Sequence, residues 1–425
     1  MGAIAHRALD QRLERGSATP IVVAFSGGGD SLALLLEAKR WADRAGRRLV
    51  AMTVDHGLQP AGAEWALWCR RRAEREGVPH QTLVWRGVKP AKGLPAAARL
   101  ARHRLIANAA RDLGARIILL GHTADDSLEA TIMSEDAVRI SAPRPWSPSP
   151  VWPEGRGLFI LRPLLAARRS AIRSVLECAG QRWIDDPVNL DQRHPRARAR
   201  LIAAGRTPDD RSPDRPDLAA LLGASRIGPA GQIELPVKSL SDGSREACRA
   251  YLGAALLCVA GREAPARGSQ IDRLMTRIAG PDAFACTLAG ARVAKSADRL
   301  TLVREIGDTR RYGRPVAYPQ LGEIAVWDGR FEVQASEAGL AVAPLAGLAA
   351  RLSSLQREGL RALDPAARLS VPVVVDAQGK VSCPLTTPDP RITLRSLVAE
   401  RLAAASGAVQ SEAAIWRVAK SAAAS

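Results

Sequence analysis

A glycine-rich turn near the amino terminus has the composition of a phosphate-binding loop. Residues 26–31 read Ser-Gly-Gly-Gly-Asp-Ser and follow a short apolar run at residues 21–25. Consecutive glycines let backbone amides face inward, and the helix expected to follow adds positive potential at its start. The hydroxyls of Ser26 and Ser31 can donate hydrogen bonds to phosphate oxygens, and Asp30 can bind a magnesium ion that bridges those oxygens. The turn is neither a Walker A loop nor a dinucleotide fingerprint.

A second group of chemically active side chains is acidic. Asp125, Asp126 and Glu129 fall in the first turn of a predicted helix, and Glu129 lies on the same face as both aspartates. Acidic residues are favoured at a helix start by the helix dipole, so a structural role is one interpretation of this cluster. Beside a phosphate loop, however, an acidic face repels a nucleotide unless a metal ion or a cationic substrate lies between them.

The order of the predicted elements brings these groups together. Strand-like runs occupy residues 21–25, 49–54, 81–85 and 117–120, and helix-like runs occupy residues 32–46, 64–76, 96–113 and a stretch that opens near Asp125. Alternating strands and helices form right-handed crossovers, which predicts an α/β fold with a doubly wound parallel sheet. Ligands of such sheets bind at the carboxyl ends of the strands, where the glycine turn, Asp55-His56 and Gly121-His122 all fall.

The remaining chain is predicted to form smaller α+β domains. Residues 143–157 are too rich in proline for a helix or a central strand and are expected to form a surface loop. Residues 287–305 are typical of a hairpin, and residues 323–327 and 371–375 of strands. We expect an N-terminal arm at 1–18, a catalytic domain at 19–205, a linker at 206–230, a mixed helical and hairpin domain at 231–310, and an α+β domain at 311–425.

Composition narrows the class of protein. The 425 residues include 61 Lys plus Arg against 43 Asp plus Glu, a net charge of +18 that favours polyanionic partners, although an arginine-rich genome would produce the same excess. No run approaches the roughly 20 apolar residues of a membrane span, and the first residues lack the apolar core of a signal peptide, so we expect a cytoplasmic protein. The six cysteines show no CxxC spacing, which disfavours a zinc or iron-sulfur site.

Several motifs together resemble one family. Residues 26–31 reproduce the SGGxDS motif of the PP-loop ATP pyrophosphatases, and within that superfamily the chain resembles the tRNA(Ile)-lysidine synthetases. The further matches are, in order, Val54-Asp55-His56-Gly57-Leu58, Ala98-Arg99 with Arg102-His103, Gly121-His122 with Asp125, Asp126 and Glu129, Arg162-Pro163-Leu164, and Asp186-Pro187-Val188-Asn189 with Asp191, Arg196 and Arg200.

The resemblance implies a fold, a reaction and a site. The fold would be that of the adenine nucleotide alpha-hydrolases. O2 of cytidine-34 in the CAU anticodon of tRNA(Ile) would attack the α-phosphate of ATP, and the ε-amine of free L-lysine would then displace AMP, with Mg²⁺ as the metal. The implied catalytic residues are Asp30, which also binds the metal, Asp126 and Arg99. The implied ATP-binding residues are Ser26, Gly27, Gly28, Gly29, Asp30, Ser31, Asp55, His56, Gly121 and His122, and those for lysine or tRNA are Asp125, Glu129, Arg196 and Arg200.

The chain departs from the family pattern near the predicted lysine pocket. Ser127 and Ala130 replace the usual Gln and Thr, and His103 replaces a Tyr. The Arg-Gly-Ser-Gly stretch of the family is absent from the segment at 134–157. Trp146 and Trp152 in this segment either stack on bases of the anticodon stem or pack on the domain.

Other functions use a similar turn. The tRNA thiolases of the superfamily need reactive cysteines or an iron-sulfur cluster, and amidotransferases need a glutaminase cysteine, for which this chain offers no pattern. The alternatives that stay open are another adenylating ligase of the superfamily, such as one acting on a small molecule, and an RNA-binding protein that binds nucleotide without catalysis.

Overall fold

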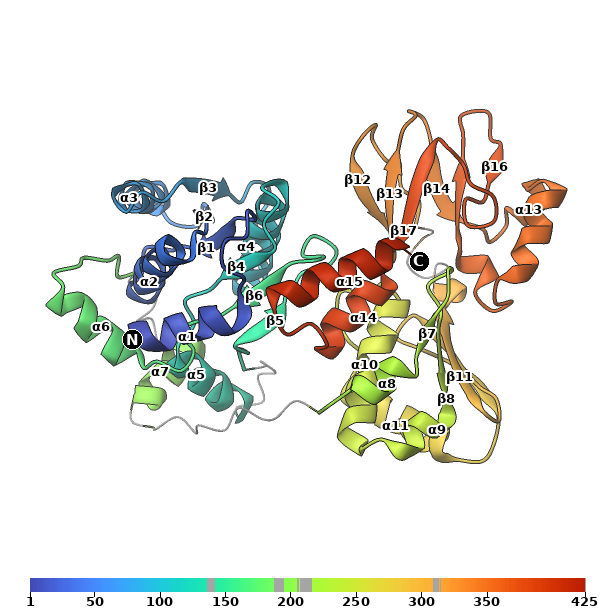
Figure 1. The fold of residues 1–425 in the computed structure, drawn as a ribbon, viewed down its shortest axis with the longest axis horizontal. Helices are drawn as coiled ribbons and strands as arrows, with labels where there is room; N and C mark the ends of the chain where they lie inside the picture. Colours follow the sequence, from blue (N-terminus) through green and yellow to red (C-terminus); the bar gives the residue numbers. More distant parts are fainter. Residues whose placement is uncertain are drawn as a thin grey trace. The chain divides into compact units, whose positions relative to one another are not determined.

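The chain forms two compact units. The computed structural model describes residues 1–135, 142–186, 195–204, 206, 216–308, 313 and 315–424. Unit 1 comprises residues 1–214 and 410–416, and unit 2 comprises residues 215–409 and 417–425 (Figure 1). Among the described residues, no helix is both long enough and apolar enough to cross a membrane.

Unit 1 is built on a six-stranded sheet in the order β3-β2-β1-β4-β6-β5. Its strands are β1 (Ile21–Ala24), β2 (Leu49–Asp55), β3 (His80–Val84), β4 (Ile117–Leu119), β5 (Trp146–Pro148) and β6 (Phe159–Leu161). All neighbouring strands are parallel except β5, which runs antiparallel to β6. The helices of unit 1 before residue 205 are α1 (Gly2–Arg12), α2 (Gly29–Ala45), α3 (Gly62–Arg75), α4 (Leu94–Asp112), α5 (Ala124–Glu135), α6 (Arg169–Cys178) and α7 (Pro195–Ala204). The predicted doubly wound α/β fold is confirmed.

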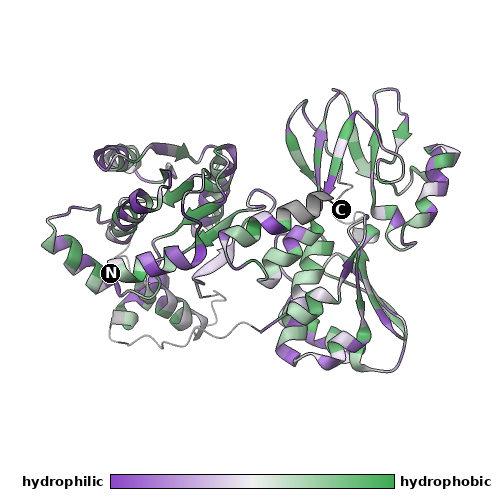
Figure 2. Ribbon diagram, viewed as in Figure 1, coloured by the Kyte–Doolittle hydropathy of each residue, from purple (hydrophilic) through white to green (hydrophobic). Residues whose placement is uncertain are grey.

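The central strands are apolar on both faces because helices cover both sides of the sheet. Val22 of β1 pairs with Val50 of β2 and with Ile118 of β4, and all three side chains are buried. These strands are green in Figure 2, whereas the surrounding helices carry purple residues along one face. The carboxyl ends of β1, β2 and β4 therefore lie side by side at one edge of the sheet, which is where the predicted site residues follow.

The segment at 143–157 differs from the loop that the sequence predicts. Residues 146–148 form β5 at the edge of the sheet, a position that tolerates proline because one side of an edge strand needs no ladder hydrogen bonds. Trp146 is buried and stacks on Phe159, with ring centroids 5.0 Å apart. Of the two readings for Trp146, the structure therefore supports packing on the domain rather than base stacking.

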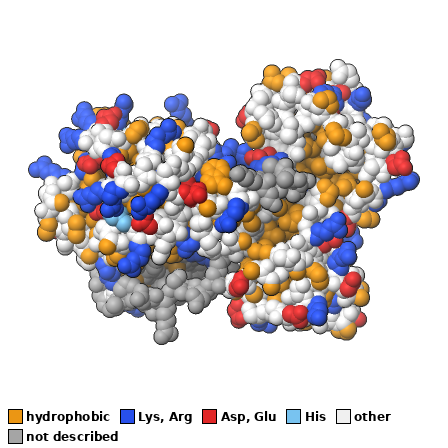
Figure 3. Space-filling model, in the orientation of Figure 1, with side chains coloured by type: hydrophobic (Ala, Val, Ile, Leu, Met, Phe, Trp, Pro, Cys, Tyr) orange, Lys and Arg blue, Asp and Glu red, His pale blue; other side chains and the backbone are white. Residues whose placement is uncertain are grey.

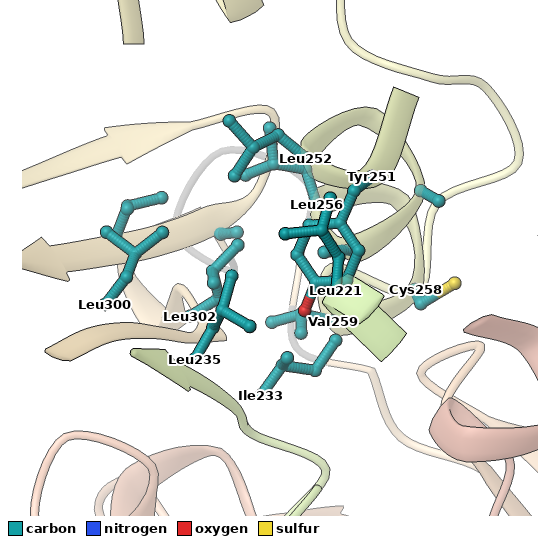
Figure 4. Close-up of a cluster of buried hydrophobic side chains, with 14 of the residues drawn as sticks. Leu221, Ile233, Leu235, Tyr251, Leu252, Leu256, Cys258, Val259, Leu300 and Leu302 are labelled. Atoms are coloured by element: carbon teal, nitrogen blue, oxygen red, sulfur yellow. The ribbon is translucent and has the colours of Figure 1, made fainter. Parts of the chain in front are cut away.

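Unit 2 contains three smaller sheets. The first, in the order β7-β8-β11-β10-β9, is formed by β7 (Arg226–Ile227), β8 (Ile233–Pro236), β9 (Phe284–Leu288), β10 (Ala291–Lys295) and β11 (Arg299–Arg304). The helices α8 (Ala219–Gly223), α9 (Val237–Asp242), α10 (Arg245–Val259) and α11 (Gly268–Ala279) accompany it. Side chains of α10, including Tyr251 and Leu256, pack against Leu235 and Leu302 of this sheet (Figure 4). The hairpin predicted at 287–305 is confirmed by β10 and β11.

The other two sheets of unit 2 have three strands each. One is formed by β12 (Ile324–Trp327), β13 (Phe331–Ala335) and β17 (Ile392–Ser396), and the other by β14 (Ala341–Pro344), β15 (Pro372–Val375) and β16 (Val381–Ser382). The helix α13 (Ser354–Gly359) lies between β14 and β15 in the chain, α14 (Val398–Ser406) follows β17, and α15 (Glu412–Ala424) is the last element. β12 and β15 confirm the strands that the sequence predicts near 323–327 and 371–375.

Residues 410–416 complete unit 1 through a buried ion pair. Arg47, just before β2, donates to Glu412 over distances of 2.8 and 2.9 Å, and neither side chain is exposed to solvent. Glu412 also accepts from the backbone amide of Glu14 at 2.9 Å, and Arg47 donates to the carbonyl of Thr19 at 3.0 Å. Two charges can be buried at this depth only because each neutralises the other.

Removal of one partner should therefore destabilise unit 1 strongly. We expect Glu412→Ala to lower the free energy of unfolding by about 3–5 kcal/mol, because the variant leaves the Arg47 guanidinium buried without a counter-ion. Urea denaturation followed by tryptophan fluorescence measures the loss. The control is Asp43→Ala, which removes an exposed carboxylate paired with Lys39 and should cost at most about 0.5 kcal/mol. Equal losses in the two variants would contradict the structural role of the buried pair.

Candidate active site

A cavity of about 490 Å³ lies at the carboxyl ends of β1, β2 and β4. Nine of the ten residues predicted to bind ATP line it, namely Ser26, Gly28, Gly29, Asp30, Ser31, Asp55, His56, Gly121 and His122. The side chains of Arg102, Arg169, Arg173 and Arg200 line it as well. The cavity thus combines a glycine turn with several cations, which is the composition expected of a site for a phosphorylated ligand.

The glycine turn has a defined geometry. Gly27 has a φ of +85°, a conformation that side chains disfavour, and a Cβ there would lie 2.5 Å from Cδ1 of Ile184. The amide of Ile184 donates to the carbonyl of Gly27 at 3.0 Å. The hydroxyl of Ser31 donates to the carbonyl of Gly28 at 2.8 Å and accepts from the amide of Ser26 at 3.2 Å. The serine side chains and Ile184 therefore hold the turn open before any ligand binds.

The start of α2 approaches the end of β4 closely. Gly28 precedes α2 in an extended conformation, so the first amides of a 17-residue helix follow directly on the turn. A Cβ at Gly121 would lie only 3.0 Å from the carbonyl oxygen of Asp30. Glycine at 121 is needed because the two backbones pass this near to each other, and its position brings His122 to the cavity.

Asp30 has one engaged and one unengaged carboxylate oxygen. Oδ2 accepts from Nε of Arg169 at 3.0 Å, whereas Oδ1 is buried with no hydrogen-bond partner in the described part of the chain. Burial raises the pKa of Asp30 above its ordinary value. A divalent cation would satisfy the unengaged oxygen. Over the described residues, no three acidic, His or Cys side chains gather to bind a metal, so such a cation would rely on phosphate oxygens and water for its other ligands.

The predicted acidic cluster at the start of α5 is buried and held by hydrogen bonds. Oδ2 of Asp126 accepts from the amide of Thr123 at 2.7 Å, which caps α5, and its Oδ1 pairs with Arg196. Oδ2 of Asp125 accepts from the amide of Arg169 at 2.7 Å and so caps α6, while its Oδ1 pairs with Arg168. Both aspartates therefore have structural roles that do not depend on a substrate.

Glu129 is the most buried member of the cluster, with only 1% of its side chain exposed. It accepts from Arg169 at 2.9 Å, from Arg196 at 2.9 Å and from Arg200 at 3.0 Å. Apolar contacts between α5 and α7, such as those of Met133 with Ala199 and Ala203, hold the helix that carries two of these arginines. The sequence predicts a metal ion or a cationic substrate between the acidic cluster and a nucleotide. In the structure, arginines of the protein itself occupy that position.

A second pair of arginines consists of Arg102 of α4, which lines the cavity, and Arg162, which directly follows β6. Burial lowers the pKa of Arg102 to about 10, and that of Arg162 likewise, so both stay charged at neutral pH. Arg162 donates to Nδ1 of His122 at 2.8 Å, and burial lowers the pKa of His122 to about 3. Burial also lowers the pKa of His103 to about 2. Of these four groups, Arg102 and His122 line the cavity, where they offer a charged guanidinium group and a neutral imidazole to a polyanion.

The structure adds residues that the sequence reasoning did not assign to the site. Arg169 contacts Asp30 and Glu129 at once, and Ile184 fixes the glycine turn. The only signal in the sequence for Arg169 is indirect: several acidic side chains need cations nearby. This signal does not identify the arginines that supply those cations. Predicted Arg99 lies one turn before Arg102 on α4, outside the cavity lining. Pro187, Val188, Asn189 and Asp191 of the last motif lie outside the described residues.

Comparisons of the sequence with known proteins identify one family. Residues 1–204 match the family described as PP-loop domain. The chain is 43% identical to the tRNA(Ile)-lysidine synthase of Caulobacter vibrioides over 95% of its length and 97% of that relative. It is 36% identical to that of Hyphomonas neptunium, over 72% and 85% of the two chains. Among solved structures, the U34-tRNA thiolase NcsA of Methanococcus maripaludis is similar at a TM-score of 0.40 and 14% identity, covering 47% of this chain and 69% of that one.

The geometry of the turn predicts an asymmetry between two glycines. We expect Gly27→Ala to weaken nucleotide binding at least about tenfold, since an alanine at positive φ costs about 1–2 kcal/mol and its Cβ collides with Ile184. Gly16→Ala is the control, because Gly16 has a φ of +68° with open space around it and lies outside the cavity. Gly16→Ala should lower the stability of the protein and leave its nucleotide affinity unchanged. Calorimetric titration with an ATP analogue and thermal unfolding separate the two effects, and equal nucleotide affinities would contradict this account of the turn.

Burial of His103 predicts a specific pH dependence of stability. Its folded pKa of about 2 lies below the unfolded value of about 6.5, so its contribution to stability is full above pH 6.5 and is lost as the pH falls below that value. We expect His103→Gln to remove this dependence. Between pH 7 and pH 5.5, wild type should lose about 1 kcal/mol more than the variant in urea denaturation. Parallel losses would show that the ring is not buried in its neutral form.

Proposed function

The chain belongs to the family of tRNA(Ile)-lysidine synthases, and we propose that the cavity at the glycine turn of unit 1 is where its ATP-dependent formation of lysidine takes place. The protein is thus a ligase that consumes ATP and modifies tRNA(Ile). The observation that carries the location is the meeting of the PP loop, the half-engaged Asp30 and several arginine side chains around one cavity. We further propose that the reaction takes place in the cytoplasm.

The first step activates the base. In our proposal, the triphosphate of ATP lies along the turn formed by Ser26, Gly27, Gly28, Gly29 and Ser31, with Asp55, His56, Gly121 and His122 around the nucleotide. The O2 atom of cytidine-34 in the CAU anticodon forms a bond to the α-phosphorus while the bond to diphosphate breaks. The amides at the start of α2, together with Arg102 and Arg99 of α4, stabilise the charge that develops on the transferring phosphoryl group.

Asp30 is the proposed ligand of a Mg²⁺ ion. Its buried and unengaged Oδ1 is an oxygen of the kind this ion prefers, and phosphate oxygens and water would complete the coordination shell. When bound, the metal neutralises phosphate charge. Asp126 supports this region by capping α5 and by pairing with Arg196, which aligns its helix with the turn.

In the second step, free L-lysine replaces AMP on the base. The ε-amine attacks C2 of the cytidine, and AMP leaves with the former O2. The acidic cluster supplies the negative charge that attracts the cationic amino acid. Of its members, we assign the contact with the ammonium group of lysine to Glu129, because Asp125 already caps α6. Asp125 would be the neighbouring carboxylate. Arg196 and Arg200 keep their contacts with Glu129 in our proposal, and they meet nucleotide phosphate or tRNA with the rest of their guanidinium groups.

The tRNA partner is supported by charge. The chain carries a net charge of +18, and Lys and Arg side chains are spread over the visible face of unit 1 at the left of Figure 3. Such a surface attracts a phosphate backbone, and its affinity should fall as salt concentration rises.

A pair of aspartates lining the same cavity tests the reaction. We expect Asp30→Asn to reduce ATP–diphosphate exchange in the presence of tRNA(Ile) at least about a hundredfold. The metal ion that neutralises the phosphoryl charge would lose its proposed protein ligand. Asp185→Asn is the control because Asp185 also lines the cavity, yet its side chain is 72% exposed. Full exchange in Asp30→Asn would contradict the metal assignment. For wild type, release of AMP rather than ADP should require both tRNA(Ile) and lysine, and mass spectrometry of the nucleosides should detect lysidine.

A further inference from the structure

Arg169 connects the glycine turn to the acidic cluster. Its Nε lies 3.0 Å from Oδ2 of Asp30, and its Nη1 lies 2.9 Å from Oε1 of Glu129. Its backbone amide is fixed by Asp125 at 2.7 Å, so the side chain starts from a defined point at the beginning of α6. One guanidinium group therefore spans the proposed nucleotide site and the proposed lysine site.

The charges of this region are balanced without any substrate. Four carboxylates, those of Asp30, Asp125, Asp126 and Glu129, pair with four arginines, Arg168, Arg169, Arg196 and Arg200. Glu129 is almost fully buried, whereas Arg169 and Arg200 line the cavity in front of it. An incoming ammonium group can reach Glu129 only if an arginine gives up its contact, and a displaced guanidinium group needs a new anion.

Arg169 has such an anion within reach once nucleotide is bound. Because it already touches Asp30 of the glycine turn, phosphates bound along that turn would lie beside its guanidinium group. Arg169 and Arg196 both pair with Asp126, Arg169 at 3.5 Å and Arg196 more closely. The contact with Asp30 of the glycine turn is therefore what sets Arg169 apart from Arg196.

We propose that Arg169 exchanges Glu129 for a phosphate of the bound nucleotide and thereby couples the two substrates. Nucleotide draws the arginine toward the turn and frees Glu129 for lysine, and lysine at Glu129 pushes the arginine toward the phosphates. Binding of either substrate then increases the affinity for the other by the same factor, as linkage requires. This inference rests on the proposed function, since it takes Glu129 as the acid that binds lysine.

The test measures coupling rather than activity. Isothermal titration calorimetry of the full-length protein gives the affinity for L-lysine with and without Mg²⁺ and α,β-methylene-ATP. In wild type we expect the nucleotide to tighten lysine binding about tenfold. In Arg169→Gln the ratio should fall to about one. Lysine alone should also bind that variant more tightly than wild type, because Glu129 has lost a competing cation. A general folding defect would not produce this gain.

The matched control is Arg173→Gln. Arg173 lies one turn later on α6, lines the same cavity and pairs with the exposed Asp185 at 3.5 Å. This variant removes an equal charge and should keep the wild-type ratio. A wild-type ratio in Arg169→Gln, or the same loss in Arg173→Gln, overturns the inference.

Three further outcomes are informative. If Arg169→Gln does not fold, Arg169→Lys decides, because an ammonium group cannot bridge Asp30 and Glu129 as the guanidinium group does, and an unchanged ratio there overturns the inference. Wild-type protein that binds nucleotide but never lysine would overturn the proposed lysine site together with the coupling. Lysine binding that is indifferent to nucleotide would overturn the coupling alone.

Discussion

The burial of Glu129 is the constraint on which the site depends. A carboxylate with almost no contact with water needs cations as partners, and here three guanidinium groups from α6 and α7 surround it. This requirement fixes the positions of both helices relative to α5. It also positions Arg169 beside the glycine turn, where Arg169 donates a hydrogen bond to Asp30. The electrostatics of one side chain thus organise groups that lie far apart in the sequence.

The two sides of the cavity have opposite tasks. On the α5 side, positive and negative charges cancel, so that side can accept a cationic substrate only by rearranging its ion pairs. On the α4 side, Arg102 and Arg162 retain their charge beside two imidazoles that burial keeps neutral, and this excess of positive charge suits a triphosphate. In the proposed reaction, this asymmetry gives the nucleotide and the amino acid different approaches to the same reacting centre.

Much of this arrangement could be predicted from the sequence. Period and composition identified the parallel sheet, and the rule that ligands bind at strand ends placed Asp55, His56 and His122 around the glycine turn. The ion-pair partners could not be predicted, because an acidic cluster requires cations without specifying which arginines supply them. The edge strand at Trp146 was not predicted, because the proline content of its segment favours a loop. Proline is excluded only from the central strands of a sheet. The pairing of Arg47 with Glu412, 365 residues apart, has no local signal at all.

That pairing also has a consequence for how the protein is made. Arg47 belongs to the part of the chain that a ribosome delivers first, whereas Glu412 emerges only when almost all of the polypeptide has been synthesised. Until then Arg47 lacks its counter-ion, and the nascent nucleotide-binding unit cannot reach its full stability. Translation that stops before Glu412 would therefore leave a product with every residue of the cavity present and its supporting unit incomplete, a natural substrate for chaperones and proteases.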